Sequence, residues 1–172
     1  MDRDLLIIGG GPGGYVAAIR GAQLGKKVTL IEQDKVGGTC LNRGCIPTKA
    51  LYKNAEIVNT LSHIDDFGVN IADFSISMDK VQKRKNDIVE KLRSGIDQLL
   101  KGNGIEVIKG QAMLKGNKNV EVKCSDGTVT TISADKIIIA AGSYSTKLPV
   151  PGVDLNGVMT SDEVLELNYI PK

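Results

Sequence analysis

Cys40 and Cys45 are separated by four residues near the start of the chain, in the stretch GGTCLNRGCIPTKAL. Three kinds of chemistry fit such a pair. A zinc site needs about four ligands, and only Cys124 and the single histidine, His63, remain to complete one, without a recognisable spacing. Two inert core cysteines are the second possibility, because free cysteine often packs as a small apolar residue. The third possibility is the labile disulfide of a redox enzyme.

The residues around the two cysteines favour the redox interpretation. Gly38, Gly44 and Pro47 predict a bent backbone. A bridge over this spacing needs a bend, because an ideal helix would turn the two side chains away from each other. Such pairs in cytosolic proteins are usually redox machinery rather than staples. Lys49, four residues after Cys45, could share a helix face with it and favour the thiolate, although a solvated lysine fits the spacing equally well.

A glycine-rich turn near the N-terminus is the second chemical motif. The apolar run Leu5–Ile8 predicts a strand buried on both faces, and Gly9, Gly11 and Gly14 follow it with the spacing G-x-G-x-x-G. We assign Gly9 to the tight turn, Gly11 to the close approach of a pyrophosphate and Gly14 to the packing of a helix on the sheet. The pyrophosphate would lie at the helix N-terminus, where N–H groups and the helix dipole favour an anion.

Glu32 completes the pattern of a dinucleotide-binding turn. It follows the predicted strand Val28–Ile31 and lies roughly 20 residues beyond Gly9, where an acid bonds a ribose hydroxyl. The alternative is a tight turn between strand and helix that binds no ligand. A flavin is the usual two-electron relay between a nicotinamide and a disulfide, so the two motifs together favour FAD over NAD in this first site.

The stretch GGTCLNRGCIPTKAL resembles the active-site signature of the class I pyridine nucleotide-disulfide oxidoreductases, and its wording is closest to the dihydrolipoamide dehydrogenases. The resemblance implies that Cys40 is the interchange thiol that attacks the dithiol substrate. It implies that Cys45 is the thiol beside the flavin that forms the charge-transfer pair, and that Lys49 contacts the flavin. Arg43 departs from the family, where valine is usual, and adds a positive charge between the cysteines.

The resemblance also implies the remaining contacts to FAD. Ala141-Gly142-Ser143 is similar to the family's A-T-G stretch near the flavin, with alanine in place of the threonine, and Ala112 would meet the adenine through its backbone. The full set of expected FAD-binding residues is Gly9, Gly11, Pro12, Gly14, Glu32, Gln33, Gly38, Thr39, Cys40, Cys45, Lys49, Ala112, Ala141, Gly142 and Ser143. We expect no metal site.

The resemblance covers the whole chain and implies a function for a longer parent enzyme. Such a flavoprotein reoxidises the dihydrolipoyl group of a 2-oxo-acid dehydrogenase or glycine-cleavage complex, passes the electrons through Cys40, Cys45 and FAD to NAD⁺, and is a homodimer. We expect residues 1–148 to be the N-terminal part of the FAD-binding domain. Residues 149–172 would be a connector towards an NAD-binding domain absent from this sequence, and the fragment alone would lack turnover.

Three alternatives stay open at this point. The first is a stand-alone FAD- or nucleotide-binding module without turnover. The second is a related disulfide reductase of the glutathione or mercuric type. The third is a thiol-based redox sensor, which needs only the two cysteines and no flavin.

Hydrophobic patterning predicts the elements that position these residues. We expect an α/β fold: a Rossmann-like FAD-binding domain of three layers, with a parallel sheet plus a small antiparallel β-meander. Further helices are predicted over residues 50–61 and 78–100, and strands over 105–108, 120–124, 128–132 and 137–140, the last buried on both faces. Lys85 interrupts the apolar spacing of the second helix, and we interpret Lys80, Lys83, Arg84 and Lys85 as a solvated basic face. Cys124 is predicted to be a buried small hydrophobe and His63 a surface histidine.

Composition excludes several classes of protein. The chain has 172 residues, 41% of them hydrophobic, and a formal net charge of +2, which fits one globular domain and predicts no nucleic-acid partner. The apolar run at Leu5–Ile8 is much shorter than a signal sequence or the ~20 residues of a membrane span. We therefore expect a soluble, cytoplasmic protein with no membrane partner.

Overall fold

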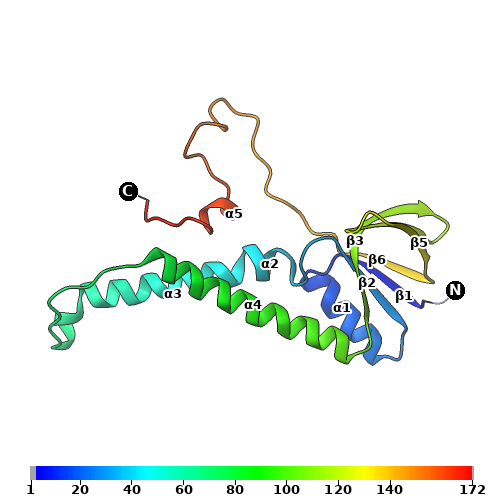
Figure 1. Ribbon diagram of the computed structural model, residues 1–172, viewed down its shortest axis with the longest axis horizontal. Helices are drawn as coiled ribbons and strands as arrows, with labels where there is room; N and C mark the ends of the chain where they lie inside the picture. The colour runs from blue at the N-terminus through cyan, green and yellow to red at the C-terminus, as the bar shows by residue number, and fades with distance from the viewer. Residues whose placement is uncertain (1–2, 172) are drawn as a thin grey trace. The chain divides into compact units, whose positions relative to one another are not determined.

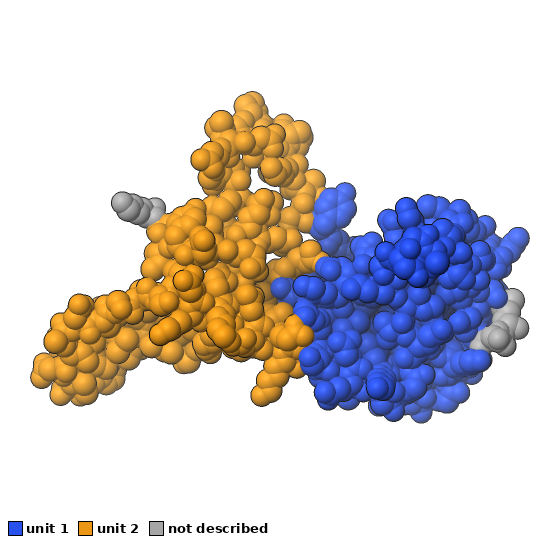
Figure 2. Space-filling model, viewed as in Figure 1, with its two compact units in different colours: residues 1–42, 92–144 blue, residues 43–91, 145–172 orange. Residues whose placement is uncertain are grey.

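The computed structural model describes residues 3–171 (Figure 1). The elements in chain order are β1 (Leu5–Ile8), α1 (Pro12–Gln23), β2 (Val28–Glu32), α2 (Gly38–Arg43), α3 (Cys45–Ser62), the 3₁₀ turn η1 (Ile64–Phe67), α4 (Met78–Gly102), β3 (Glu106–Gly116), β4 (Asn119–Cys124), β5 (Val129–Ser133), β6 (Lys136–Ile139) and α5 (Ser161–Val164). They divide into two units, coloured separately in Figure 2. The first comprises the described residues up to Asn42 with Leu92–Tyr144, and the second comprises Arg43–Lys91 with the described residues from Ser145 onward.

The first unit contains one sheet with the strand order β5-β4-β3-β2-β1-β6. β1 pairs in parallel with β2 and β6, and β2 pairs in parallel with β3, whereas β3, β4 and β5 form an antiparallel meander. The predicted strand at 105–108 is confirmed but continues to Gly116, because the later part of β3 pairs with β4. Gly110 permits this close pairing, since a Cβ there would lie 2.6 Å from the carbonyl oxygen of Lys123.

Alternation along β1 assigns the two faces of the parallel sheet. Leu6 packs in a buried cluster with residues of the meander, including Val120 and Val122. On the other face α1 lies against β1 and β2. A Cβ built at Gly21 of α1 would lie 3.0 Å from Leu5 Cδ2 and 3.1 Å from Val28 Cγ2. Helix, parallel sheet and meander are therefore three layers, and the predicted fold class is confirmed (Figure 1).

β6 lies at one edge of this sheet, at the end opposite β5. Its parallel pairing with β1 confirms that the apolar run near residue 138 returns to the parallel sheet. The prediction that both of its faces are buried is wrong, because Ile138 is 37% exposed and Ile139 is 63% exposed. In the described part of the chain, β6 has a strand neighbour on one side only.

The second unit contains α3, the first part of α4, and α5. Both long helices confirm the predicted ranges. The interpretation of Lys85 as solvated is wrong, because this residue is 1% exposed. The neighbouring Arg84 forms hydrogen bonds to α3: Arg84 Nη1 donates to the Ala50 carbonyl at 3.0 Å and to Asn54 Oδ1 at 3.1 Å. Among the helices of residues 3–171, none is long and apolar enough to cross a bilayer.

A polar cluster ties together the amino-terminal ends of the parallel strands. Thr29 is buried and donates from Oγ1 to Glu106 Oε2 at 2.8 Å. Arg3 donates from Nε to Thr29 Oγ1 at 2.9 Å and from Nη2 to Glu106 Oε2 at 2.9 Å. Burial raises the pKa of Glu106, but the hydrogen bonds from Thr29 and Arg3 and the charges of Arg3 and Lys27 outweigh it and lower the pKa below its usual value.

The cluster predicts an acid-dependent loss of stability. A carboxyl group whose pKa is lower in the folded state stabilises the protein above its unfolded pKa, and this contribution disappears as the pH falls through the folded pKa. Because Glu106 is half exposed, we expect less than about 1 kcal/mol. Glu106→Gln should therefore lower the free energy of unfolding slightly at pH 7 and by a smaller amount at pH 3, measured by urea titration at both values. A difference that grows towards pH 3 would contradict this.

Candidate functional site

The glycine-rich turn lies at the carboxyl end of β1, where backbone packs against backbone. Gly9 has a φ of +102°, and a Cβ there would lie 2.2 Å from the carbonyl oxygen of Ala140, the residue after β6. A Cβ on Gly14 would lie 1.7 Å from the Gly9 carbonyl oxygen. Both positions therefore exclude any side chain, since real contacts of this kind do not approach within 3 Å.

The segment before α2 packs against the same turn. The amide of Gly37 donates to the Gly10 carbonyl at 2.8 Å. Gly38 has a φ of +57°, and a Cβ there would lie 2.6 Å from Gly11 Cα. Gly11 is also the N-cap of α1, no described side chain caps it, and the first turn carries no acidic residue. Two glycine segments thus frame a helix N-terminus whose polarity suits an anion.

Glu32 is held beside the turn by backbone amides at the end of β2. Its Oε2 accepts a hydrogen bond from the Gly10 amide at 2.6 Å, and its Oε1 accepts one from the Asp34 amide at 2.8 Å. Gln33, next along the chain, is exposed. The carboxylate is therefore fixed at the edge of the sheet from which the glycine turn projects.

The residues after β6 reach the same edge. The Ala140 amide donates to the Ile8 carbonyl at 2.7 Å, which places the end of β6 beside the end of β1. Ala141, Gly142 and Ser143 follow and are exposed. Ala112 lies in another part of the sheet, half buried in β3 and paired with Val122 of β4. The carboxyl edge thus gathers the glycine turn, Glu32, Gly38 and the 141–143 stretch.

Thr39 and Cys40 lie on the short helix α2, where Thr39 is exposed and Cys40 is half buried. Asn42 anchors this helix and was missed in the sequence analysis. Its Nδ2 donates to the carbonyls of Val36 and Gly38 at 3.0 Å each, and its Oδ1 accepts from Arg93 Nη1 at 3.4 Å. An asparagine between the two cysteines carries no sequence signal for such bonds, because the accepting carbonyls become neighbours only through the bend at Gly37 and Gly38.

Cys45 and Lys49 belong to the second unit, on α3. Cys45 is the first residue of this helix and is exposed, and Lys49 lies one turn later and is also exposed. Gly44, the N-cap, has φ −140° and ψ −111°, so α2 and α3 are two helices rather than one. The bend predicted between the two cysteines is therefore present. Among residues 3–171, no group of three or more His, Cys, Asp or Glu side chains could hold a metal ion.

Comparison with known proteins decides the family. A model described as pyridine nucleotide-disulphide oxidoreductase matches residues 3–172. The chain belongs to this family. It is 42% identical to a dihydrolipoyl dehydrogenase of Bacillus subtilis over 98% of its own length, and 42% identical to the mitochondrial dihydrolipoyl dehydrogenase of Caenorhabditis elegans over 100% of its length. It covers 37% and 35% of these two relatives, so it spans little more than a third of their length.

A solved structure gives the same result for the fold. The chain is similar to the HOCl-induced flavoprotein disulfide reductase RclA from Escherichia coli, with a TM-score of 0.79 and 32% identity. The match covers 98% of this chain and 35% of that one. Pyridine nucleotide-disulfide oxidoreductases of this kind depend on FAD, and the first unit fits a dinucleotide. It offers a glycine turn held in close backbone contact with Gly38, an uncapped helix N-terminus and the fixed carboxylate of Glu32.

Proposed function

We propose that this chain is the N-terminal, FAD-binding and disulfide-bearing part of a dihydrolipoyl dehydrogenase. The observation that carries the proposal is the cysteine stretch at residues 37–49, in a chain 42% identical to such an enzyme along 98% of its length. In this proposal residues 1–148 are FAD-binding and residues 149–172 connect to an NAD⁺-binding part; residues 1, 2 and 172 lie outside the described residues. The protein would act as a cytoplasmic homodimer on the dihydrolipoyl group of a 2-oxo-acid dehydrogenase or glycine-cleavage complex.

The proposed chemistry starts from a disulfide between Cys40 and Cys45. One thiolate of the dihydrolipoyl group attacks Cys40 Sγ, so that a mixed disulfide forms and Cys45 leaves as a thiolate. The second substrate thiolate then attacks the substrate sulfur of the mixed disulfide, closes the lipoyl ring and releases Cys40 as a thiolate. The substrate has lost two electrons and two protons, and the cysteine pair holds the electrons.

Bound FAD supplies a two-electron relay to NAD⁺, so that the net reaction converts a dithiol and NAD⁺ into a disulfide, NADH and one proton. The other proposed roles belong to this chain's own residues. The glycine turn and Gly38 would hold the pyrophosphate against the start of α1, and Glu32 would exchange its bond from the Gly10 amide for ribose hydroxyls. Lys49, one turn after Cys45, would place an ammonium near the flavin.

A second candidate is a flavoprotein disulfide reductase that acts on a different thiol. The similarity to RclA supports it, because that protein shares the fold along 98% of this chain at 32% identity. The two candidates use the same cysteine pair and differ only in the thiol or disulfide that exchanges with it. The substrate therefore separates them.

An absorbance titration tests the proposal. The protein at its natural length should show the band of oxidised flavin. Stoichiometric dihydrolipoamide should reduce it and produce a long-wavelength shoulder from a thiolate beside the flavin. Reduction by dithiothreitol but not by dihydrolipoamide would favour the second candidate. A colourless protein that cannot be reconstituted with FAD would refute both.

A further inference from the structure

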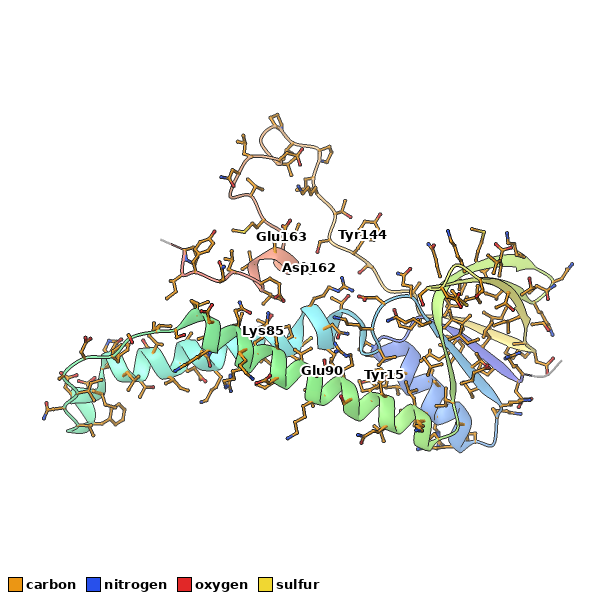
Figure 3. All side chains as sticks on the ribbon, in the orientation of Figure 1. Tyr15, Lys85, Glu90, Tyr144, Asp162 and Glu163 are labelled. Carbon is orange, nitrogen blue, oxygen red and sulfur yellow. The ribbon has the colours of Figure 1, made fainter. Side chains whose placement is uncertain are left out.

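Helix α4 holds the segment after α5 through two side chains, Gln82 and Lys85. Lys85 Nζ donates to the Leu165 carbonyl at 2.9 Å and forms an ion pair with Glu166 Oε1 at 2.7 Å. Gln82 Nε2 donates to the Leu167 carbonyl at 2.7 Å and to the Leu165 carbonyl at 3.2 Å. α5 and the part of α4 that carries Gln82 and Lys85 belong to the second unit, and Figure 3 labels Lys85 on α4 and Asp162 and Glu163 on α5.

The contact requires burial of the charged ammonium of Lys85, which ordinary packing of a helix surface does not require. Lysine is almost never fully buried unless its ammonium is paired, because burying an unpaired charge is strongly unfavourable. Lys85 is 1% exposed, and the partners of its ammonium, Leu165 and Glu166, come from two consecutive residues of one segment. Carbonyl groups at the C-terminal end of a helix have no hydrogen-bond partner within that helix. Gln82 and Lys85 supply donors to the carbonyls that follow α5.

The amide of Gln82 is oriented by the same carbonyls. Its Oε1 is buried and has no hydrogen-bond partner in the part of the chain that the structure describes. The reverse orientation would turn Oε1 towards the oxygens of Leu165 and Leu167, so the amide keeps both donors on the segment and leaves its acceptor unmatched. Leaving the buried Oε1 without a donor costs about 1–3 kcal/mol. The orientation of the Gln82 amide is therefore explained by its two bonds to the segment after α5 and not by packing within α4.

The start of the held segment is also fixed. A capping box joins Thr160 and Glu163, and the Thr160 amide donates to Glu163 Oε2 at 2.5 Å. The bonds from Thr160 lower the pKa of Glu163. Leu165 is buried. The segment Thr160–Leu167 is therefore capped at one end and bonded to α4 at the other.

We propose that Gln82 and Lys85 are positioning residues that fix the segment Thr160–Leu167 on α4, and thereby set where the following NAD⁺-binding part presents its nicotinamide. This proposal rests on the proposed function. Hydride transfer to NAD⁺ would need reacting atoms held about 3–3.5 Å apart, and an error of about 1 Å would slow such a step about 100-fold. The proposed attack of the dithiol on Cys40 assigns no role to Gln82 or Lys85.

Lys85→Met in the protein at its natural length tests the proposal, because methionine keeps most of the apolar stem and removes the ammonium. Lys83→Met is the matched control, since Lys83 lies on the same helix, is 75% exposed and pairs with Asp87 one turn away. Hydrogen–deuterium exchange should become at least about 10-fold faster at residues 163–168 in Lys85→Met and stay unchanged in Lys83→Met. Stopped-flow reoxidation by NAD⁺ should slow by about 10- to 100-fold, while reduction by dihydrolipoamide stays within about twofold.

Several outcomes would overturn the proposal: unchanged exchange at residues 163–168, equal slowing of both half-reactions, or equal effects of Lys83→Met. If Lys85→Met does not fold, Gln82→Met replaces it, because this change removes the two donors without altering a charge and should give the same pattern. If the unmodified protein is not reduced by dihydrolipoamide, the proposed function fails, and the exchange measurement still decides whether Gln82 and Lys85 hold the segment.

Discussion

Gly14→Ala is expected to destabilise the protein strongly and to abolish retention of FAD, whereas Gly13→Ala leaves both intact. A Cβ on Gly14 would lie 1.7 Å from the Gly9 carbonyl oxygen, and Gly9 is held directly after β1 by the bond from its amide to the Ile31 carbonyl at 2.8 Å. The overlap can be relieved only by moving α1 away from the sheet. Overpacking of this kind costs about 3 kcal/mol, a large part of the roughly 5–15 kcal/mol that stabilise a typical domain.

Gly13 is the matched control because it is the preceding residue of the same helical turn. Its Cβ would meet the Ala140 side chain at 3.8 Å, an ordinary contact. Alanine there should gain about 0.5–1 kcal/mol of helix propensity over glycine. The measurements are urea unfolding and the flavin-to-protein absorbance ratio after purification. If Gly14→Ala retained stoichiometric FAD and wild-type stability, the assignment of Gly14 to close helix–sheet packing would be wrong.

The glycine motif could be interpreted correctly from the sequence because it encodes local backbone geometry. Gly9 and Gly14 are required by the turn from β1 into α1, and a strand, a turn and a helix in immediate succession leave few other arrangements. The parallel order of β1, β2 and β6 follows in the same way, since apolar runs separated by a helix return to one sheet. The bend at Gly44 was also visible, because its local sequence disfavours one continuous helix.

Lys85 and Asn42 could not be interpreted in this way. Lys85 stands among Lys80, Lys83 and Arg84, and nothing near it in the sequence indicates that residues 165 and 166 will cover it. A contact between residues so far apart in the sequence leaves no periodic pattern around Lys85. The pattern of its neighbours alone therefore favours a solvated helix face. Asn42 bonds carbonyls within six residues, but only after the left-handed Gly37 and Gly38 have turned the chain back. Both residues donate to backbone carbonyls, and the residue types along the sequence do not indicate which carbonyls will come within reach.

If the proposed function holds, serine in place of either Cys40 or Cys45 in the protein at its natural length is expected to reduce turnover of dihydrolipoamide by at least about 1,000-fold, the usual scale for removing a nucleophile that acts as part of a unit. The two variants should differ in colour. Cys40→Ser keeps the thiol assigned to the flavin, so the oxidised protein should show the long-wavelength shoulder without any reductant. Cys45→Ser removes that thiol and should show a plain flavin band.

Cys124→Ser is the matched control, since Cys124 lies half buried on β4 against the core cluster of the meander. It should keep full turnover and lose only a little stability. If the long-wavelength absorbance shoulder appeared in Cys45→Ser and not in Cys40→Ser, Cys40 would be the thiol beside the flavin and Cys45 the interchange thiol. Turnover that survives in either variant would mean that electrons do not pass through a bridge between these two sulfurs. The cysteine stretch, and not the nucleotide fold alone, carries the proposed function, so that result would leave only a dinucleotide-binding domain of the family's fold.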